Sequence, residues 1–262
     1  MHILRLNQVS KQFGGIAACS NISFTAESGQ IVGLIGPNGA GKTTVLNLIS
    51  GDYNLSSGEI IFKDQILSGC RPDTIVDKGI ARTFQNIRLF RNLSVLENVC
   101  IAVDRATDYS LAEALLRVPK VLRRETETRR QAMKYLEALG LAGKANLKAE
   151  SLPYGLQRKL EIARALALKP ELLLLDEPAA GMNPEESAEL AKLIRLVHTQ
   201  YNLTTLLIEH HMDVVMELCD KIVVLNFGEK LAEGTGAEIQ ADSQVLRAYL
   251  GSGERSKRRA RN

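Results

Sequence analysis

The chain alternates between two patterns of apolar residues, which predict strands in some stretches and helices in others. Short apolar runs broken by Gly and Ser are typical of strands, whereas apolar residues three or four positions apart predict helices. We expect strands at residues 3–9, 22–26, 30–35, 59–62, 80–84, 172–176, 204–208 and 221–226. Helices are expected at residues 44–49, 185–198 and 212–218. This alternation predicts an α/β core with an antiparallel β edge at its N-terminus.

Residues 86–168 interrupt the alternation with a mainly helical pattern. Ser94, followed three positions later by Glu97, predicts a helix start in which each side chain caps the other residue's backbone. Helical spacing with many charges continues at residues 108–117 and 120–139. We therefore expect one domain over residues 1–254, with a helical subdomain inserted in its α/β core.

The loop after the strand at 30–35 carries the pattern GxxxxGK(S/T), which binds phosphate where a strand precedes it and a helix follows it. Its residues are Gly36, Pro37, Asn38, Gly39, Ala40, Gly41, Lys42, Thr43 and Thr44. Glycines let successive N–H groups converge on one point, where the helix dipole and Lys42 add positive charge. ATP with its Mg²⁺ ion fits this loop, and the Thr43 hydroxyl is the expected metal ligand. The loop alone does not distinguish a kinase, a GTPase and a transport ATPase.

Two acids, Asp176 and Glu177, follow the apolar run at residues 172–175. Ligands of open α/β sheets lie at the carboxyl ends of the strands, so both acids are expected near the nucleotide. Neighbouring side chains on a strand point opposite ways, which allows a division of roles. We predict that Asp176 binds Mg²⁺, directly or through water, and that Glu177 accepts a proton from the attacking water.

Three further residues, His210, Gln85 and Phe13, are candidates because of the motifs that lie near them. His210 follows the apolar strand at 204–208, where an imidazole can contact a γ-phosphate, although alone it is equally a structural histidine. His211 is the weaker choice of the two. Gln85, where the strands give way to the helical block, is a candidate to coordinate Mg²⁺ or its water and to act in catalysis, although in isolation it is typical of a surface glutamine. Phe13 precedes two glycines and is a candidate to stack on the base, although a phenylalanine taken alone is more often a core residue.

Composition indicates a soluble globular protein, with 45% hydrophobic and 24% charged residues among 262. No apolar run approaches the roughly 18 residues that cross a bilayer, and the first residues lack the apolar core of a secretory signal. We therefore expect any membrane role to come through a partner. The four cysteines form no CxxC pair, which argues against a disulfide framework and a zinc site.

The net charge of +3 is concentrated at the C-terminus. Residues 255–262 hold five basic residues and no acid, so the rest of the chain is net acidic. We interpret these residues as a basic, disordered tail, with contact to anionic lipid head groups as the alternative. The pattern gives no basic face for nucleic acid on the folded body.

The order of these features, together with LPYGLQRKLEIARAL at 152–166, resembles the ATP-binding subunits of ABC transporters over about residues 3–250. Kinases and GTPases lack the family's signature segment, which corresponds here to Leu152, Pro153, Tyr154, Gly155 and Leu156. The resemblance implies a P-loop NTPase fold of the ABC ATPase type and an ATP hydrolase. It also implies a head-to-tail dimer in which each ATP lies between one subunit's phosphate loop and the other subunit's signature segment.

Two positions depart from the family pattern. Pro153 stands where the family usually has a serine, and a proline offers neither a hydroxyl nor an N–H. Gly155 and the helix after it still permit backbone N–H contacts. Asn183 replaces the usual aspartate of the family's dimer-contacting loop. The two departures suggest unequal ATP sites in a heterodimer with a second ATP-binding subunit.

Residues 79–99, the helical insertion and residues 208–234 are most similar to the larger ATP-binding subunit of branched-chain amino-acid importers, the LivG type. The resemblance implies ATP-driven uptake of leucine, isoleucine and valine. It further implies a peripheral position on the cytoplasmic face of the bacterial inner membrane, two membrane permease subunits and an extracytoplasmic solute-binding protein. A urea or short-chain amide importer and a non-transport soluble ABC ATPase remain as alternatives.

Overall fold

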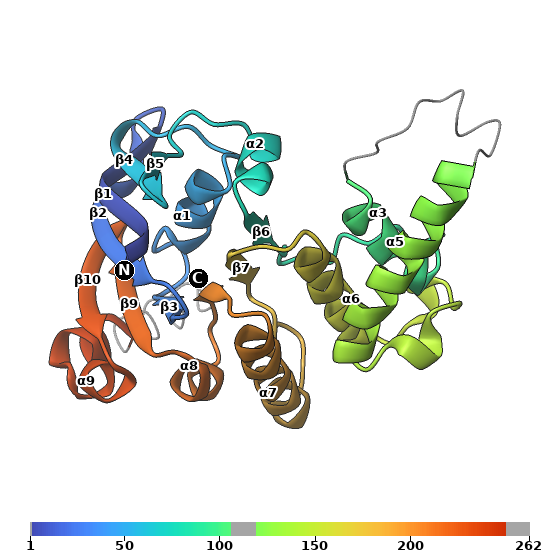
Figure 1. Ribbon diagram of the computed structural model, residues 1–262. Coiled ribbons are helices and arrows are strands. Elements are labelled where there is room, and N and C mark those ends of the chain that lie inside the picture. The colour runs from blue at the N-terminus through green and yellow to red at the C-terminus, as the bar shows by residue number, and fades with distance from the viewer. Residues whose placement is uncertain (1, 106–118, 250–262) are drawn as a thin grey trace. The chain divides into compact units, whose positions relative to one another are not determined.

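The structure is a computed structural model that describes residues 2–105 and 119–249 (Figure 1). The chain forms two compact units, one from the residues up to Arg82 and from Glu171 onward, the other from Thr83 to Pro170. The first unit is α/β and the second is helical, which confirms the expected fold class. The helix predicted at 108–117 and the basic tail predicted at 255–262 lie outside the described residues.

The N-terminal strands form an antiparallel sheet in the order β2-β1-β4-β5. They are β1 (His2–Phe13), β2 (Ile16–Glu27), β4 (Ser57–Phe62) and β5 (Gln65–Ile66). A turn at residues 14–15 joins β1 to β2 and sets Phe13 opposite Ile16. The strands expected at 3–9 and 22–26 are therefore parts of one longer hairpin.

A second sheet of six strands has the order β10-β9-β3-β8-β7-β6. Its strands are β3 (Ile31–Ile35), β6 (Ile80–Arg82), β7 (Leu172–Asp176), β8 (Thr204–Ile208), β9 (Lys221–Asn226) and β10 (Glu229–Gly234). Within the described residues, β10 is the only strand of this sheet that pairs antiparallel with its neighbour. Ile208 pairs with Asp176 on one side and Leu34 on the other, so β3, β7 and β8 end at one edge. The loops that follow these strands are thereby brought together.

Helices cover both faces of this second sheet. They are α1 (Lys42–Ile49), α2 (Pro72–Asp77), α7 (Pro184–Gln200), α8 (Met212–Leu218) and α9 (Gly236–Ala241). Val45 and Leu46 of α1 belong to a core that joins the antiparallel sheet to one face of the second sheet. The opposite face packs against α8 and α9 through a smaller cluster that includes Ile35 and Val224. Successive side chains of a strand point to opposite faces of the sheet, so neighbouring residues enter different cores.

The helical unit contains α3 (Val95–Val103), α5 (Pro119–Ala138) and α6 (Tyr154–Ala167), which pack against one another. The helix start predicted at Ser94 is confirmed. The Ser94 hydroxyl accepts the Glu97 N–H at 3.1 Å, and the Glu97 carboxylate accepts the Ser94 N–H at 2.7 Å. These two bonds satisfy backbone donors that the first turn of α3 leaves unpaired.

The predicted element ends agree with the structure for β7, β8, β9 and α8. The strand expected at 80–84 was too long, because β6 ends at Arg82 and Thr83 begins the helical unit. Among the strands and α-helices of residues 2–105 and 119–249, β5, α2, β10 and α9 were missed. Each is short or mainly polar, and therefore carries little of the periodic signal on which the prediction depends.

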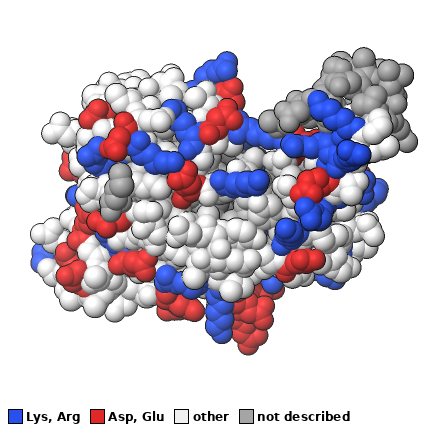
Figure 2. Space-filling view, in the orientation of Figure 1, with Lys and Arg blue, Asp and Glu red and all other residues white. Residues whose placement is uncertain are grey.

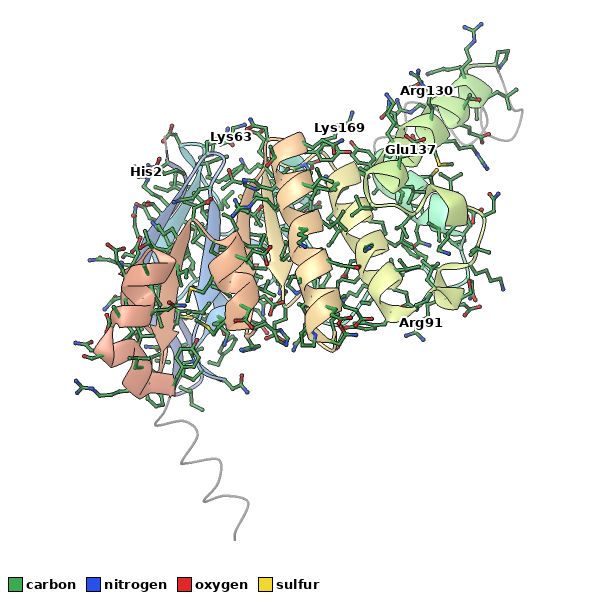
Figure 3. All side chains as sticks on the ribbon, turned by 90° about the horizontal axis from the view of Figure 1, so that it is seen from below. His2, Lys63, Arg91, Arg130, Glu137 and Lys169 are labelled. Carbon is green, nitrogen blue, oxygen red and sulfur yellow. The ribbon has the colours of Figure 1, made fainter. Side chains whose placement is uncertain are left out.

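Charged side chains of opposite sign lie among one another on the face of the α/β unit shown in Figure 2. Lys63, labelled in Figure 3, pairs with Glu171 at 2.6 Å. In the helical unit, Arg130 on α5 pairs with Glu127 one turn away at 2.8 Å (Figure 3). Water screens exposed pairs of this kind, so these surfaces add little to stability.

Candidate nucleotide site

The predicted phosphate loop connects β3 to α1 with a backbone that needs glycine at two positions. Gly36 and Gly41 have φ of 149° and 100°, in the range that side chains disfavour. A Cβ at Gly36 would overlap the Leu225 carbonyl, and one at Gly41 would lie 2.7 Å from the Ala18 carbonyl oxygen. The loop therefore adopts its curl only with these glycines in place.

Lys42 begins α1, and its ammonium group is turned back onto the loop. The Nζ atom donates to the carbonyls of Gly36 and Pro37 at 2.7 and 3.0 Å, and the residue is only 5% exposed. Burial lowers the pKa of Lys42, and the negative charges of Glu177 and Asp176 oppose that shift. No side chain caps the start of α1, so a helix N-terminus and a buried cation face the same loop. This donor set fits a polyphosphate.

Thr43 and Thr44 complete the first turn of α1, with Thr43 exposed. Its hydroxyl is a neutral oxygen donor close in sequence to the loop, and the Asp176 carboxylate at the end of β7 is a charged one. Oxygen donors of this kind suit Mg²⁺ bound with a nucleotide. The residues therefore fit the metal that the sequence predicts.

Asp176 is buried and bonded to an arginine that the sequence analysis did not single out. Its Oδ2 atom lies 2.9 Å from Nη2 of Arg82, the last residue of β6. Nη1 of Arg82 also contacts Asn47 and Ser50 of the α1 region at 2.7 and 2.8 Å, and Asp52 at 3.0 Å. Arg82 thus ties the acid at the end of β7 to the helix that follows the phosphate loop.

Glu177 follows β7 in an unusual backbone conformation and meets His210. Its φ is 48°, which a non-glycine residue adopts only at a cost of about 1–3 kcal/mol. The Glu177 N–H donates to the Ile208 carbonyl at 2.9 Å, which holds this conformation at the end of β8. The carboxylate Oε1 lies 2.6 Å from Nε2 of His210. The structure therefore brings together two residues that lie 33 positions apart in sequence.

Glu209 was missed as a candidate and connects the two loops behind this pair. It is 2% exposed, and its Oε1 atom accepts the Ala179 N–H at 2.7 Å. Its Oε2 atom accepts the backbone N–H of His210 at 3.0 Å and that of His211 at 3.3 Å. An acid directly between an apolar strand and two histidines was the available signal. Glu209 therefore positions the backbone of His210.

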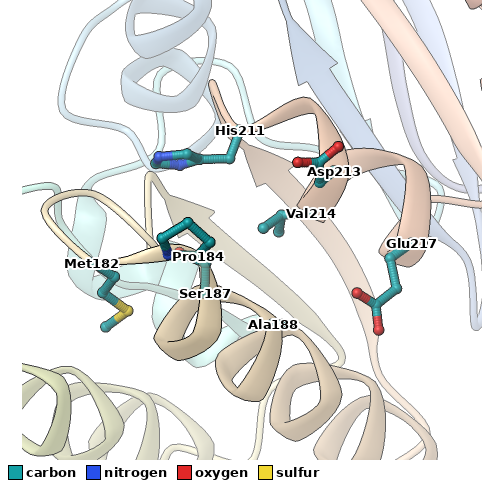
Figure 4. Close-up of a pocket in the computed structure, with 8 residues that line it drawn as sticks. All are labelled: Met182, Pro184, Ser187, Ala188, His211, Asp213, Val214 and Glu217. Atoms are coloured by element: carbon teal, nitrogen blue, oxygen red, sulfur yellow. The ribbon is translucent and has the colours of Figure 1, made fainter.

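His211 points into a different place. Its Nδ1 atom lies 3.2 Å from Glu209, and the ring lines a small pocket with Met182 and Pro184 at the start of α7 (Figure 4). Asp213 lines the same pocket from α8. Of the two histidines, His210 is therefore the one that meets Glu177.

Phe13 lies at the end of β1 and is not a core residue. It is 44% exposed, and its ring meets the edge of the Tyr53 ring with centroids 5.1 Å apart. The Lys11 Nζ atom lies 4.9 Å from the Phe13 ring centroid. An exposed aromatic pair beside a cation is a surface on which a planar base can stack. Tyr53 was missed because nothing in the sequence indicates that it lies beside Phe13.

Gln85 and the signature segment, residues 152–156, belong to the helical unit. Gln85 is exposed in the loop that follows β6. Leu152 is buried and anchors the segment, whereas Tyr154 at the start of α6 is 46% exposed. A Cβ at Gly155 would meet nothing within 4 Å, so the fold of this chain does not itself require the glycine. Pro153 precedes α6 without a side-chain cap.

Asn183, a departure from the family pattern, has a local role in the structure. Its Oδ1 atom accepts the Glu186 N–H at 2.9 Å, and the Glu186 carboxylate accepts the Asn183 N–H at 3.0 Å. Pro184 occupies the first position of α7 behind this cap. Asparagine is among the best residues at such a position, so Asn183 preserves the start of α7.

Among residues 2–105 and 119–249, no helix combines the length and apolarity that crossing a membrane requires.

Two family models match the chain. One, described as ABC transporter, matches residues 19–180, which include the phosphate loop and the two acids Asp176 and Glu177 at the end of β7. The other, described as branched-chain amino acid ATP-binding cassette transporter, matches residues 229–255 at the C-terminal end.

Curated relatives match almost end to end. The high-affinity branched-chain amino acid transport ATP-binding protein LivG of Escherichia coli K12 is 45% identical over 95% of this chain and 98% of its own. The corresponding protein BraF of Pseudomonas aeruginosa is 42% identical over the same shares. The phosphonates import ATP-binding protein PhnC of Frankia casuarinae is 34% identical over 95% of this chain and 96% of its own.

Solved structures share the fold. The ADP conformation of MJ1267, an ATP-binding cassette of an ABC transporter, is 31% identical with a TM-score of 0.83, over 96% of this chain and 99% of that one. A dimeric post-hydrolysis structure of the ATP-binding cassette MJ0796, bound to ADP and Pi, is 25% identical with a TM-score of 0.73 over 88% of this chain and 98% of that one. With the geometry above, these likenesses show that the chain belongs to the ABC transporter family, as an ATP-binding subunit with ATP hydrolase activity.

Proposed function

We propose that the chain powers an importer of the branched-chain amino acids leucine, isoleucine and valine. The observation that carries the proposal is the 45% identity to LivG over nearly the full length of both chains. The family model matched at residues 229–255 is itself described by branched-chain amino acids. A relative named for phosphonates matches less closely, at 34% identity, which favours the branched-chain solutes over others.

ATP is held by the phosphate loop and by Phe13. Backbone N–H groups of the phosphate loop and the Lys42 ammonium bind the phosphates, whose oxygens replace the two carbonyls that Lys42 now contacts. Phe13 stacks on the base. Thr43 and Asp176 would hold Mg²⁺, which would neutralise charge on the transferred phosphate. The buried Arg82 keeps the Asp176 carboxylate in one orientation.

Hydrolysis depends on Glu177 as the general base. Its carboxylate accepts the proton of the attacking water, a contribution of roughly 10²–10⁴ in rate. The 2.6 Å contact from His210 fixes the direction of that carboxylate, and the other edge of the imidazole contacts the γ-phosphate. Gln85 coordinates Mg²⁺ or its water and carries the state of the nucleotide to the helical unit.

The active form is a heterodimer with a second ATP-binding subunit. The exposed Tyr154 and the unobstructed Gly155 support a role for the signature segment on ATP bound to that partner. Pro153 removes the hydroxyl that the family usually offers there, so the two sites of the dimer are unequal. The dimeric ADP- and Pi-bound structure of a related cassette supports dimerisation.

The subunit acts as a peripheral protein on the cytoplasmic face of the bacterial inner membrane. Two permease subunits bind its helical unit, and an extracytoplasmic solute-binding protein delivers the amino acid to them. Transport subunits among its relatives support this assembly. Nucleic acid has no part in it.

The test is uptake of labelled leucine, valine and urea by source cells in which Glu177→Gln replaces the native chain. Glu189→Gln, an exposed change on α7, is the matched control. Loss of leucine and valine uptake with urea uptake retained is the expected result. Loss of urea uptake alone would transfer the assignment to a urea importer. Unchanged uptake of all three solutes would refute the transport role.

A further inference from the structure

One fully buried arginine in the helical unit donates hydrogen bonds to the carbonyls of two successive residues. Arg158 of α6 is 0% exposed, and its Nη1 atom donates to the Phe84 carbonyl at 2.7 Å. Its Nη2 atom donates to the Gln85 carbonyl at 2.8 Å. The planar guanidinium suits this task, because its N–H groups lie in a fixed fork that can bind two neighbouring acceptors.

Glu161, one turn further along α6, holds the same loop from its other side. Its Oε2 atom accepts from Nη1 of Arg158 at 2.6 Å. Its Oε1 atom faces the backbone N–H groups of Phe84 and Arg88 at 3.3 and 3.4 Å. Burial raises the pKa of Glu161, and the charge of Arg158 opposes that shift. The ion pair therefore binds both backbone N–H groups and backbone carbonyls of the loop that carries Gln85.

Arg158 also reaches the signature segment. Its Nη2 atom lies 3.2 Å from the hydroxyl of Tyr154, which begins α6 and is 46% exposed. One side chain thus contacts a signature residue at the surface and the backbone of Gln85. A buried ion pair adds little net stability over an apolar pair of the same volume. Its geometry is therefore more informative about what it positions than about what it stabilises.

We propose that Arg158 is a positioning residue for Gln85. Through its contact with Tyr154, Arg158 also couples the signature segment to Gln85. Contact of a nucleotide with Tyr154 and Gly155 moves the Tyr154 hydroxyl, and Arg158 passes that movement to the carbonyls of residues 84 and 85. This inference rests on the proposed roles of Gln85 and of the signature segment. It adds to them a named route that lies wholly inside the helical unit.

The test is a double-mutant cycle in the full chain, with kcat and KM for Mg-ATP hydrolysis as readouts. Arg158→Gln is made in the native chain and in Gln85→Ala. Arg130→Gln, which breaks the exposed pair on α5, is the matched control for an Arg–Glu pair one turn apart. We expect Arg158→Gln to lower kcat about tenfold with little change in KM, and to have no further effect once Gln85 is alanine.

Equal loss in both backgrounds would overturn the proposal, because a merely structural role of Arg158 acts independently of the Gln85 side chain. Unchanged kcat in Gln85→Ala itself would instead refute the proposed role of Gln85 and with it this route. If Arg158→Gln does not fold, Tyr154→Phe is put through the same cycle, since it removes one surface hydroxyl. An effect of about twofold, absent in Gln85→Ala, is then expected, and an effect that persists there would overturn the coupling.

Discussion

The carboxylate of Glu177 and the imidazole of His210 are held 2.6 Å apart by the ends of two adjacent strands, β7 and β8. Glu177 is in a left-handed backbone conformation, and its N–H donates to Ile208 on the neighbouring strand. Glu209 fixes the backbone of His210 from behind. Backbone bonds at the strand ends therefore fix the pair just beyond the edge of the sheet, which is the arrangement that catalysis by positioning requires.

Replacing Glu177 by Gln should separate binding from turnover. The amide retains the shape of the side chain but does not accept a proton, so hydrolysis should fall at least about 100-fold while ATP binding is retained. Lys42→Ala should instead abolish tight ATP binding. Phosphate release and binding of a fluorescent ATP analogue measure the two properties. Turnover at the native rate in Glu177→Gln would remove Glu177 from the role of base.

Arg82 should be important for stability because its positive charge compensates the negative charge of the buried Asp176 carboxylate. Arg82→Gln leaves the Asp176 carboxylate, itself 2% exposed, without this guanidinium. Breaking a buried ion pair costs about 3–5 kcal/mol, which urea unfolding would measure directly. Arg71→Gln, which breaks an exposed pair with Asp73, should change stability by at most about 0.5 kcal/mol. Equal effects of the two changes would contradict the role given to Arg82.

Some candidate residues have positions that follow from the local sequence, whereas others depend on which strands are neighbours in the sheet. Residues 36–44, Asp176, Glu177 and His210 could be singled out as candidates because each lies at or just after the end of an apolar strand, and parallel strands end at one edge. Arg82 was not predictable, because its role depends on β6 being the neighbour of β7. The capping role of Asn183 was available in the sequence, since Pro184 and Glu186 complete a familiar helix start.

Phe13 should contribute to nucleotide affinity and little to stability, since it is exposed at the end of β1. Stacking of a base on an aromatic ring is worth about 1–3 kcal/mol, so Phe13→Ala should weaken ATP binding by about 5- to 150-fold. Titration with a fluorescent ATP analogue gives the affinity, and thermal unfolding gives the stability. Ile66→Ala, at an exposed position on β5, serves as the control. Unchanged affinity in Phe13→Ala would exclude it as the stacking residue.

His198 should make the protein less stable in mild acid. The ring is buried between the Thr205 hydroxyl at 3.1 Å and the Gly29 carbonyl at 3.2 Å. Because a carbonyl only accepts, Nε2 carries the proton of the neutral ring and Nδ1 accepts from Thr205. Burial lowers the pKa of His198 from 6.5, and the charge of Arg195 adds to this, whereas the Gly29 carbonyl and the charge of Asp220 oppose it.

The sign of the effect follows from proton binding. As the pH falls below 6.5, the unfolded chain takes up a proton at this histidine before the native protein does, so the free energy of unfolding decreases. His198→Gln should be less stable than the native chain at pH 7.5 and should lose less further stability on going to pH 5.5. Urea unfolding at both pH values measures the difference, with His2→Gln, a change at a half-exposed side chain, as the control. If His198→Gln and the native chain lose the same stability over this interval, His198 is not the group that titrates.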